Sequence, residues 1–475
     1  MPNQRLRQPN NAPAFHSSKD CTVTNKKRQL ALGVFLTRHG HHPGAWRQPG
    51  SAKSGRPDFN YWADLVRTAE RGKLDTAFFA DFAGQSGDST KGIERRHAFL
   101  DFEPLTLTAA LASITSRIGL VATVNTNYEQ PFALARRFAS LDHISDGRIG
   151  WNIVSSLTDG AAKSYGTQPM THAERYERAS EFVDVARKLW DSWEDDAFEN
   201  ANPESGIYLN PNDVHPVQHH GKHFQISTVL DTARPVQGHP IFVQAGNSEA
   251  GREFAAKYAE MIYAAAQFIE EAQIFYADVK GRMANHGRDP DTLKVMPGLS
   301  FAIGSSQQEA QDKFGALESA VDFSGELNLM GHDVSAYPLD GPLPDLPDPE
   351  NGKGRWRQLT ALARRENLSI RQLFLRFNAV RGHRVAIGTP IQIADQIQDW
   401  FERDAADGFN LIPPLLPSSL TEFVDQVVPE LQRRGLFRTE YEGTTLREHL
   451  HLPRPQIARE AVPKAQPAPI LAPVS

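Results

Sequence analysis

Residues able to bind an anion follow one apolar run of the chain, in the segment PIFVQAGNSEAG at 240–251. Residues 241–245 have the continuous apolar character of a buried strand. Gly246 ends this run, and Asn247 and Ser248 open a helix. The first N–H groups of a helix lack intrahelical acceptors, and a hydroxyl beside them adds a further donor. The spacing therefore predicts an anion site, for example one for a phosphate, at Gly246 and Ser248.

A second candidate for the same kind of site is the segment THAERYERA, which has the signature of a helix start. Thr171 and Glu174 have capping-box spacing, so we expect the helix to begin at Thr171. His172 then lies in the first turn, and Tyr176 lies one turn further on the same face. Their N–H and O–H groups suit a phosphate, although a surface histidine beside a half-buried tyrosine is the plain structural alternative.

Polar side chains also follow the apolar runs in the first half of the chain. These residues are Asp81, Thr123, Asn125, Asn152, Ser155 and Ser156. If the runs are parallel strands of a barrel, their carboxyl ends lie together and these side chains meet. Asp81 is the one carboxylate among them, so the carboxylate pair of a glycosidase is not supported. No G-x-G-x-x-G or Walker sequence is present, so neither a Rossmann dinucleotide site nor a P-loop is supported.

Two clusters of histidines raise the question of a metal site. They are His39, His41 and His42 in RHGHHPGAW, and His219, His220 and His223 in QHHGKHF. Histidines this close can bind zinc. Neither cluster has an HExxH frame or a nearby carboxylate of evident geometry, so we predict no metal site. For the first cluster, two interpretations remain: a substrate-contacting role, for which we take His41 and His42, or a solvated loop.

The composition is that of an ordinary globular protein, with 475 residues of which 40% are hydrophobic and 23% charged. A net charge of −6 argues against a general nucleic-acid binder. The single cysteine, Cys21, excludes an internal disulfide framework and a cysteine-based zinc cluster. No apolar run approaches the roughly 20 residues that span a bilayer, and 1–28 lacks a signal-peptide core. We expect a cytoplasmic protein that does not contact membranes.

Short, continuous apolar runs recur along the chain and have the character of buried parallel strands. They span 30–36, 76–81, 118–126, 148–154, 241–246, 261–266, 295–304 and 409–415. Amphipathic helical stretches follow several of them. Eight such β-then-α units predict an α/β fold of the (β/α)8 TIM-barrel class.

The uneven spacing of the runs predicts the domain organisation. We expect a flexible N-terminal extension (1–28), one barrel domain (29–451) and a flexible tail rich in Pro and Ala (452–475). The long gap before the last run predicts an insertion at about 305–385. Long barrel insertions usually lie at the catalytic face, although a role in oligomerisation is an equal alternative.

Six motifs in this chain resemble those of one flavoprotein family. They are HPGAWR, FFAD, TVNTNYEQPFALARRFASLDHISDGRIGWNIV, HAERYERASEFVDVARKLWDSW, QAGNSEAG, and the stretch from DGFNLIPPLLPSSL to TTLREHL. Their order and spacing, over about residues 30–450, are similar to those of a group within the bacterial-luciferase superfamily. That group includes nitrilotriacetate, EDTA and dibenzothiophene-sulfone monooxygenases and pristinamycin IIA synthase.

The resemblance implies a two-component TIM-barrel monooxygenase. Such an enzyme takes reduced FMN (FMNH2) from a separate NAD(P)H:FMN reductase and uses O2 as co-substrate. A flavin-peroxide then transfers one oxygen atom to a small organic substrate, and the other atom leaves as water. The cofactor performs the oxygen chemistry, while the protein supplies orientation and a dry pocket.

The resemblance also assigns residues to the flavin site, because each family contact has a matching motif here. The cofactor-binding residues implied by matching motifs are Asp81, Thr123, His172, Tyr176 and Ser248. Asn125 and Ser156 are added because of their positions, and Gly246 because it belongs to the predicted anion site. Asn125 differs from the small hydroxyl residue expected at its position. Asn247 lies beside the flavin site, and His41 or His42 and Trp46 border the oxygen-transfer side.

Other functions remain open at this point. A deazaflavin- or flavin-dependent oxidoreductase of the same superfamily is the first alternative. A metal-dependent barrel hydrolase that uses the histidine clusters is the second, and a flavin-binding protein without activity is the third. The family further implies a homodimer or homotetramer, with a small-molecule substrate.

Overall fold

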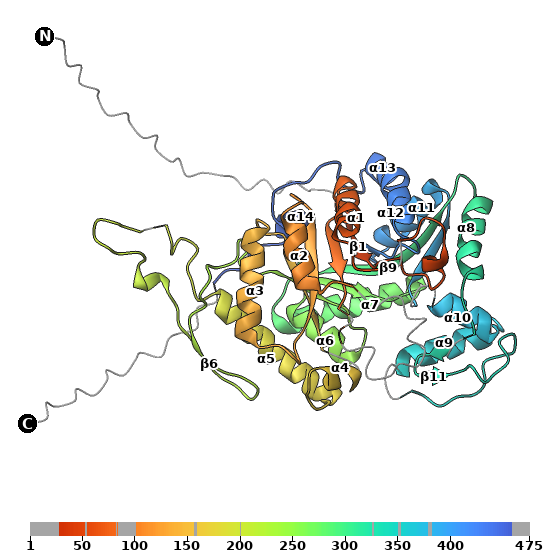
Figure 1. Cartoon of the computed structure of the whole chain (residues 1–475), viewed down its shortest axis with the longest axis horizontal. Coiled ribbons are helices and arrows are strands. Elements are labelled where there is room, and N and C mark those ends of the chain that lie inside the picture. The colour runs from red at the N-terminus through yellow and green to blue at the C-terminus, as the bar shows by residue number, and fades with distance from the viewer. Residues whose placement is uncertain are drawn as a thin grey trace, which may run out of the picture.

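The computed structural model describes residues 28–52, 55–81, 83, 101–155, 159–199, 201–324, 327–349, 353–378 and 382–457. A closed parallel barrel forms its centre, and helices surround the barrel (Figure 1). Within these ranges, no helix is both long and apolar enough to cross a membrane.

Eight strands form the ring of the barrel, and they are the eight runs predicted from the sequence. They are β1 (Ala31–Leu36), β2 (Thr76–Phe79), β3 (Gly119–Asn125), β4 (Ile149–Val154), β7 (Ile241–Gln244), β8 (Met261–Ala264), β9 (Lys294–Ile303) and β13 (Gly408–Leu411). Neighbours pair in parallel, and the ring closes because β9 pairs with β8 and β13, and β13 pairs with β1. The predicted (β/α)8 barrel is confirmed.

A ninth strand, β12 (Arg384–Gly388), joins the same sheet and begins at the end of the range expected to belong to the insertion. It pairs in parallel with the second half of β9, from Leu299 to Ile303. β9 is ten residues long, so its first half pairs with β8 and its second half with β12. The run RVAIG is short and only partly buried. A search for continuous apolar runs therefore missed it.

The helices around the barrel begin where the sequence offers caps. The predicted capping box opens α5: Glu174 N–H donates to Thr171 Oγ1 at 3.3 Å, and Thr171 N–H donates to Glu174 Oε2 at 2.9 Å. The helices that follow the first six barrel strands are α1 (Phe59–Arg71), α2 (Pro104–Ala112), α3 (Pro131–Ile144), α4 (Asp159–Ser164), α5 (His172–Trp190), α6 (Glu249–Tyr258) and α7 (Ile269–Arg282). The later helices are α8 (Gln307–Ser319), α11 (Pro390–Glu402), α12 (Ser418–Glu422), α13 (Val428–Arg433) and α14 (Leu446–His449).

The segment between α8 and β12 has a hydrophobic core of its own, centred on Trp356, Ile370 and Leu373. Its elements are β10 (Asn328–Leu329), β11 (His332–Asp333), α9 (Lys353–Arg365) and α10 (Ile370–Asn378). Figure 1 shows α9, α10 and β11 grouped together at one side of the barrel. A second long connection, between α5 and β7, contains the hairpin of β5 (Val217–His220) and β6 (Gln225–Thr228).

The end of the described chain closes the amino-terminal end of the barrel. Leu446 and Leu450 pack in one cluster with Val121, Ile241 and Met261 of the barrel strands. In Figure 1 the C-terminal helices α12 and α13 lie beside α1, as the pairing of β13 with β1 requires. This end of the barrel is therefore closed. The other end, formed by the carboxyl ends of the strands, is where TIM barrels bind ligands.

Candidate active site

The turn from β7 to α6 forms a cradle at the carboxyl end of the barrel. Gln244, the last residue of β7, accepts a hydrogen bond from Gly246 N–H at 2.7 Å through Oε1, which tightens the turn. α6 then begins at Glu249 after the N-cap Ser248, whose hydroxyl accepts from Gly251 N–H at 3.1 Å. The predicted helix start at Ser248 is confirmed. The contribution of Gln244 was missed, since a buried amide at a strand end has no distinctive motif.

The hydroxyl of Tyr176 lies over this turn, although it comes from α5. A methyl group on Gly251 would lie 3.0 Å from the Tyr176 hydroxyl oxygen and 3.1 Å from the Gly246 backbone. A methyl group on Gly246 would lie 3.2 Å from the same oxygen. Both glycines therefore permit a close approach of hydroxyl and backbone that any side chain would obstruct. Tyr176, Gly246 and Ser248, predicted from separate motifs, share one site.

His172 extends this cradle at the exposed start of α5, with its ring centroid 4.9 Å from that of Tyr176. The first turns of α5 and α6 thus meet here, and each carries the positive end of a helix dipole. Glu249, the acid in the first turn of α6, is paired with Arg252 at 3.2 Å and Arg282 at 2.6 Å. These arginines also pair with Asp278, so they offset part of the negative charge of Glu249, and the free N–H groups at the helix starts suit an anion.

Thr123 of β3 and Asn152 of β4 stand opposite each other in the parallel register inside the barrel. Both are buried, and Asn152 Nδ2 donates to Thr123 Oγ1 at 2.9 Å. Asn152 Oδ1 is buried and accepts no hydrogen bond from the residues that the structure describes. Leaving such an acceptor unpaired costs about 1–3 kcal/mol, so Asn152 is suited to accept from an N–H group of a bound ligand. The sequence placed Asn152 at a strand end without assigning it to a ligand.

Asp81 follows β2, and its carboxylate accepts from Ala83 N–H at 2.9 Å. Burial raises the pKa of Asp81, and the nearby Glu103 raises it further. Asn125, the last residue of β3, accepts from Asn127 N–H at 2.9 Å and so stabilises the loop after the strand. Ser156, the remaining residue predicted for the cofactor, lies outside the described residues.

The loop after β1 carries the two histidines predicted for catalysis, and it is bonded to the segment after β13. His41 N–H donates to Pro413 O at 3.0 Å, and His42 N–H donates to Pro414 O at 3.1 Å. His41 Nε2 lies 3.0 Å from Phe35 O, and its ring centroid is 4.4 Å from that of Phe35. Phe35 packs against the cluster inside the barrel, so His41 borders the barrel interior.

His42 points the other way. It is fully buried, with its ring 5.6 Å from that of Phe314 on α8, and its Nδ1 accepts from Gly44 N–H at 3.1 Å. Burial lowers the pKa of His42 to about 4, so it is neutral near pH 7. This arrangement suits the packing of the loop on α8.

The second histidine cluster holds the β5–β6 hairpin against α5. Glu181 Oε1 lies 3.0 Å from His219 Nε2 and accepts from Phe224 N–H at 2.8 Å. This carboxylate is distant in sequence, so the spacing of the histidines did not reveal it. Among the described residues, no group of three or more His, Cys, Asp and Glu side chains could hold a metal ion.

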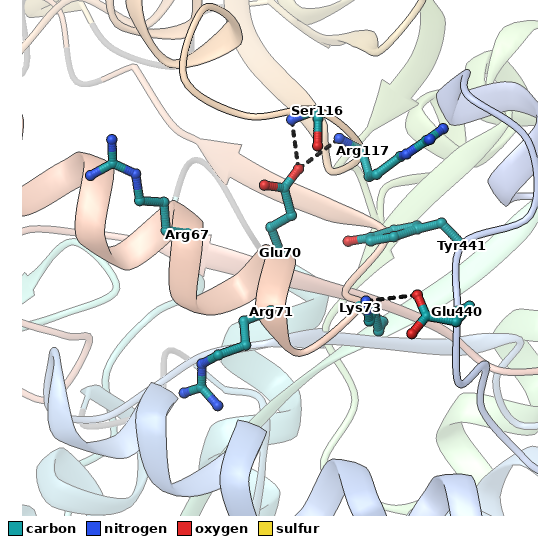
Figure 2. Close-up of a pocket in the computed structure, with 8 residues that line it drawn as sticks. All are labelled: Arg67, Glu70, Arg71, Lys73, Ser116, Arg117, Glu440 and Tyr441. Atoms are coloured by element: carbon teal, nitrogen blue, oxygen red, sulfur yellow. Dashed lines mark hydrogen bonds and ion pairs between the residues drawn. The ribbon is translucent and has the colours of Figure 1, made fainter.

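A cavity of about 470 Å³ lies at the opposite, amino-terminal end of the barrel (Figure 2). Its charged groups engage one another or the backbone: Lys73 Nζ is 2.8 Å from Glu440 Oε2, and Glu70 Oε1 accepts from Ser116 N–H at 2.8 Å. Arg67 and Arg71 extend from α1 at its rim (Figure 2). No residue predicted for the cofactor lines this cavity, so it is separate from the cradle.

The fold is that of a TIM barrel, and the β7–α6 turn at its carboxyl end lies beneath the Tyr176 hydroxyl. The chain matches the family described as luciferase-like monooxygenase over residues 33–407. The protein belongs to the luciferase-like monooxygenase family.

Curated relatives and solved structures agree with this assignment. The chain is 45% identical over 443 residues to nitrilotriacetate monooxygenase component A of Aminobacter aminovorans, covering 90% of this chain and 98% of that protein. It is 44% identical over 441 residues to N-acetyl-S-(2-succino)cysteine monooxygenase of Bacillus subtilis (strain 168), covering 91% and 99%. A riboflavin lyase structure with modified FMN and riboflavin has a TM-score of 0.77 at 29% identity, covering 89% of this chain and 95% of that one. The resemblance and the monooxygenase class predicted from the sequence are confirmed.

Proposed function

We propose that this protein binds FMN in the cradle, receives it reduced from a separate NAD(P)H:FMN reductase, and uses O2 to oxygenate a small organic substrate. The observation that carries the proposal is the Tyr176 hydroxyl above Gly246 and Gly251, where two helix starts meet. Two relatives support it: one is named as component A of its enzyme, and the solved riboflavin lyase holds a modified FMN. Reduced FMN supplies the electrons with which O2 is activated.

The phosphate of FMN is the group for which the cradle is suited. Tyr176 O–H, His172 and the first N–H groups of α6 donate to it, and Ser248 fixes the first turn of that helix. These donors come from rigid helix starts, so they hold the cofactor without reorganising when it binds.

The strand-end residues then orient the flavin ring system. Asn152 Oδ1 offers an acceptor inside the barrel, and Thr123 holds the Asn152 side chain in place. Asp81 lies at the rim, and its raised pKa makes it a proton donor or acceptor closer to neutral pH than an exposed aspartate. We assign the further predicted contacts, Asn125 and Ser156, and a catalytic role of His41 or His42 to the same proposal.

The remaining expectations concern assembly and location. We infer a homodimer or homotetramer that works in the cytoplasm, in line with the family's implied organisation. The alternative of a deazaflavin-dependent oxidoreductase makes a different prediction for the cofactor, and a titration with each cofactor separates the two.

The first experiment is an anaerobic titration of the protein with reduced FMN, oxidised FMN and a reduced deazaflavin, followed by admission of O2. We expect reduced FMN to bind most tightly. Tyr176→Phe removes one hydrogen bond to a charged group, so its Kd for reduced FMN should rise about tenfold. Tyr208→Phe, at a tyrosine that is 68% exposed between α5 and β5, is the matched control and should change nothing. Absence of binding by reduced FMN, or an unchanged Kd in Tyr176→Phe, would contradict the proposed site.

A further inference from the structure

Two tyrosines from neighbouring loops stack on one another at the carboxyl end of the barrel, outside the cradle. Tyr128 lies in the loop after β3, and Tyr165 directly follows α4, which comes after β4. Their ring centroids are 4.4 Å apart and their planes differ by 6°. The two loops are joined at their base, where Thr126 N–H donates to Val154 O at 2.9 Å. The pair is therefore part of the catalytic face and has a defined geometry.

The Tyr165 ring packs on Tyr128, and the residue still exposes 47% of its surface. Its N–H donates to Ala161 O at 3.1 Å, and Ala161 and Ala162 bury α4 against the protein. Tyr128 is half-buried and supports the ring from behind. An aromatic ring held rigidly at a binding face, with apolar area exposed, offers a contact surface at little entropic cost.

Acidic groups determine which ligand suits this ring. Burial raises the pKa of Tyr165, and the negative charges of Asp81, Glu129 and Glu103 raise it further. The phenol therefore stays neutral. Glu129 is paired with Arg137, and the remaining carboxylates, Asp81 and Glu103, disfavour an anionic group stacked on the ring. The exposed ring surface therefore favours an uncharged group over a carboxylate.

We propose that Tyr165, backed by Tyr128, is a substrate platform on which an uncharged aromatic ring of the substrate stacks. A third ring placed parallel to the first two extends the stack in the same geometry, and its apolar face leaves water as it binds. The platform determines specificity by favouring an aromatic substrate over an aliphatic one with the same reactive group. This inference rests on the proposed function, because Asp81, one of the carboxylates near Tyr165, is also a predicted flavin contact.

The test measures ligand binding to the protein with FMN bound, using two probes that share a sulfur atom. Methyl phenyl sulfide carries a ring, and dimethyl sulfide does not. In the wild type we expect methyl phenyl sulfide to bind about tenfold more tightly. Tyr165→Ala should remove most of this difference by raising the Kd of methyl phenyl sulfide about tenfold. The Kd of dimethyl sulfide should be unchanged in this variant.

Two further variants separate stacking from other effects. Tyr165→Phe keeps the ring and should retain the wild-type preference, and Tyr208→Ala, at an exposed tyrosine elsewhere, should retain it as well. The proposal is overturned if neither probe binds, if the wild type does not prefer the ring, or if Tyr165→Ala leaves the preference intact. It is also overturned if Tyr165→Ala weakens FMN, since the ring would then hold the cofactor. Failure of the wild type to bind FMN would instead contradict the proposed function.

Discussion

The two ends of the barrel differ in the arrangement of their buried charges and acceptors. At the amino-terminal end, buried charges from distant parts of the chain pair with one another: Arg438 with Asp75, and Arg447 with Glu260. At the carboxyl end, the buried acceptor Asn152 Oδ1 has no partner among the described residues. The tyrosine hydroxyl over the β7–α6 turn likewise faces two glycines.

From this contrast we expect the amino-terminal end to determine stability and the carboxyl end to determine ligand binding. In a buried ion pair each charge compensates the other, so removing one partner alone is expected to lower the free energy of unfolding. A buried acceptor at the carboxyl end, such as Asn152 Oδ1, can gain a hydrogen bond when a ligand binds. Substitutions at the two ends should therefore change different measurements, and each prediction below tests that separation.

The largest effect is expected at the amino-terminal end. Arg438→Met leaves the buried Asp75 carboxylate with one remaining hydrogen bond among the described residues, from Leu32 N–H at 2.7 Å. We expect the free energy of unfolding to fall by about 3–5 kcal/mol, measured by urea denaturation. The folded fraction should bind reduced FMN as the wild type does. The double variant Asp75→Asn with Arg438→Met should regain most of the stability, and failure to do so would argue against the ion pair as the cause.

The next effect is expected in the cradle. Gly251→Ala places a methyl group 3.0 Å from the Tyr176 hydroxyl and 3.1 Å from the Gly246 backbone, which has little freedom to move. We expect the Kd for reduced FMN to rise about 100-fold, equivalent to about 2.7 kcal/mol, with a smaller change in stability. Gly315→Ala, at a helix position with no atom near the added methyl, is the control. Equal losses of FMN affinity in both variants would refute the steric argument.

A smaller effect is expected at the N-cap of α6. Ser248→Ala removes the hydroxyl that accepts from Gly251 N–H, and the loss of a cap typically costs about 1 kcal/mol. Both FMN affinity and stability should decline modestly, because the cap orders the helix start that holds the phosphate. Ser306→Ala removes the corresponding cap of α8 and should lower stability alone. Calorimetry and FMN titration of the two variants give the comparison.

The most gradual effect is a pH dependence common to both ends. Burial lowers the pKa of His42 and of His449 to about 4, below the ordinary value of 6.5. Between these pH values the unfolded chain binds more protons than the folded one, so stability declines as pH falls from about 6.5 toward 4. We expect a slope of about 1 kcal/mol per pH unit or less for each histidine. His449→Leu and His42→Leu should each flatten the profile, and an unchanged profile in both would contradict the assignment.

Local patterns in the sequence were sufficient to predict most of the fold and part of the site. Continuous apolar runs identified the eight barrel strands, because strands buried on both faces have few polar residues. The capping pair Thr171 and Glu174 located the start of α5, and Ser248 located the start of α6. These features depend on residues within one or two turns of each other, so they can be recognised in the sequence without knowledge of the fold.

Only the tertiary structure decided which of these residues meet and what surrounds them. Tyr176 lies over Gly246 because α5 packs beside α6. His41 borders the barrel while its neighbour His42 packs against α8. The sequence pattern likewise did not predict the partially buried strand β12 or the Tyr128–Tyr165 stack. The sequence determined local structure because backbone preferences act over a few residues, whereas contacts between distant residues depend on how the whole chain packs.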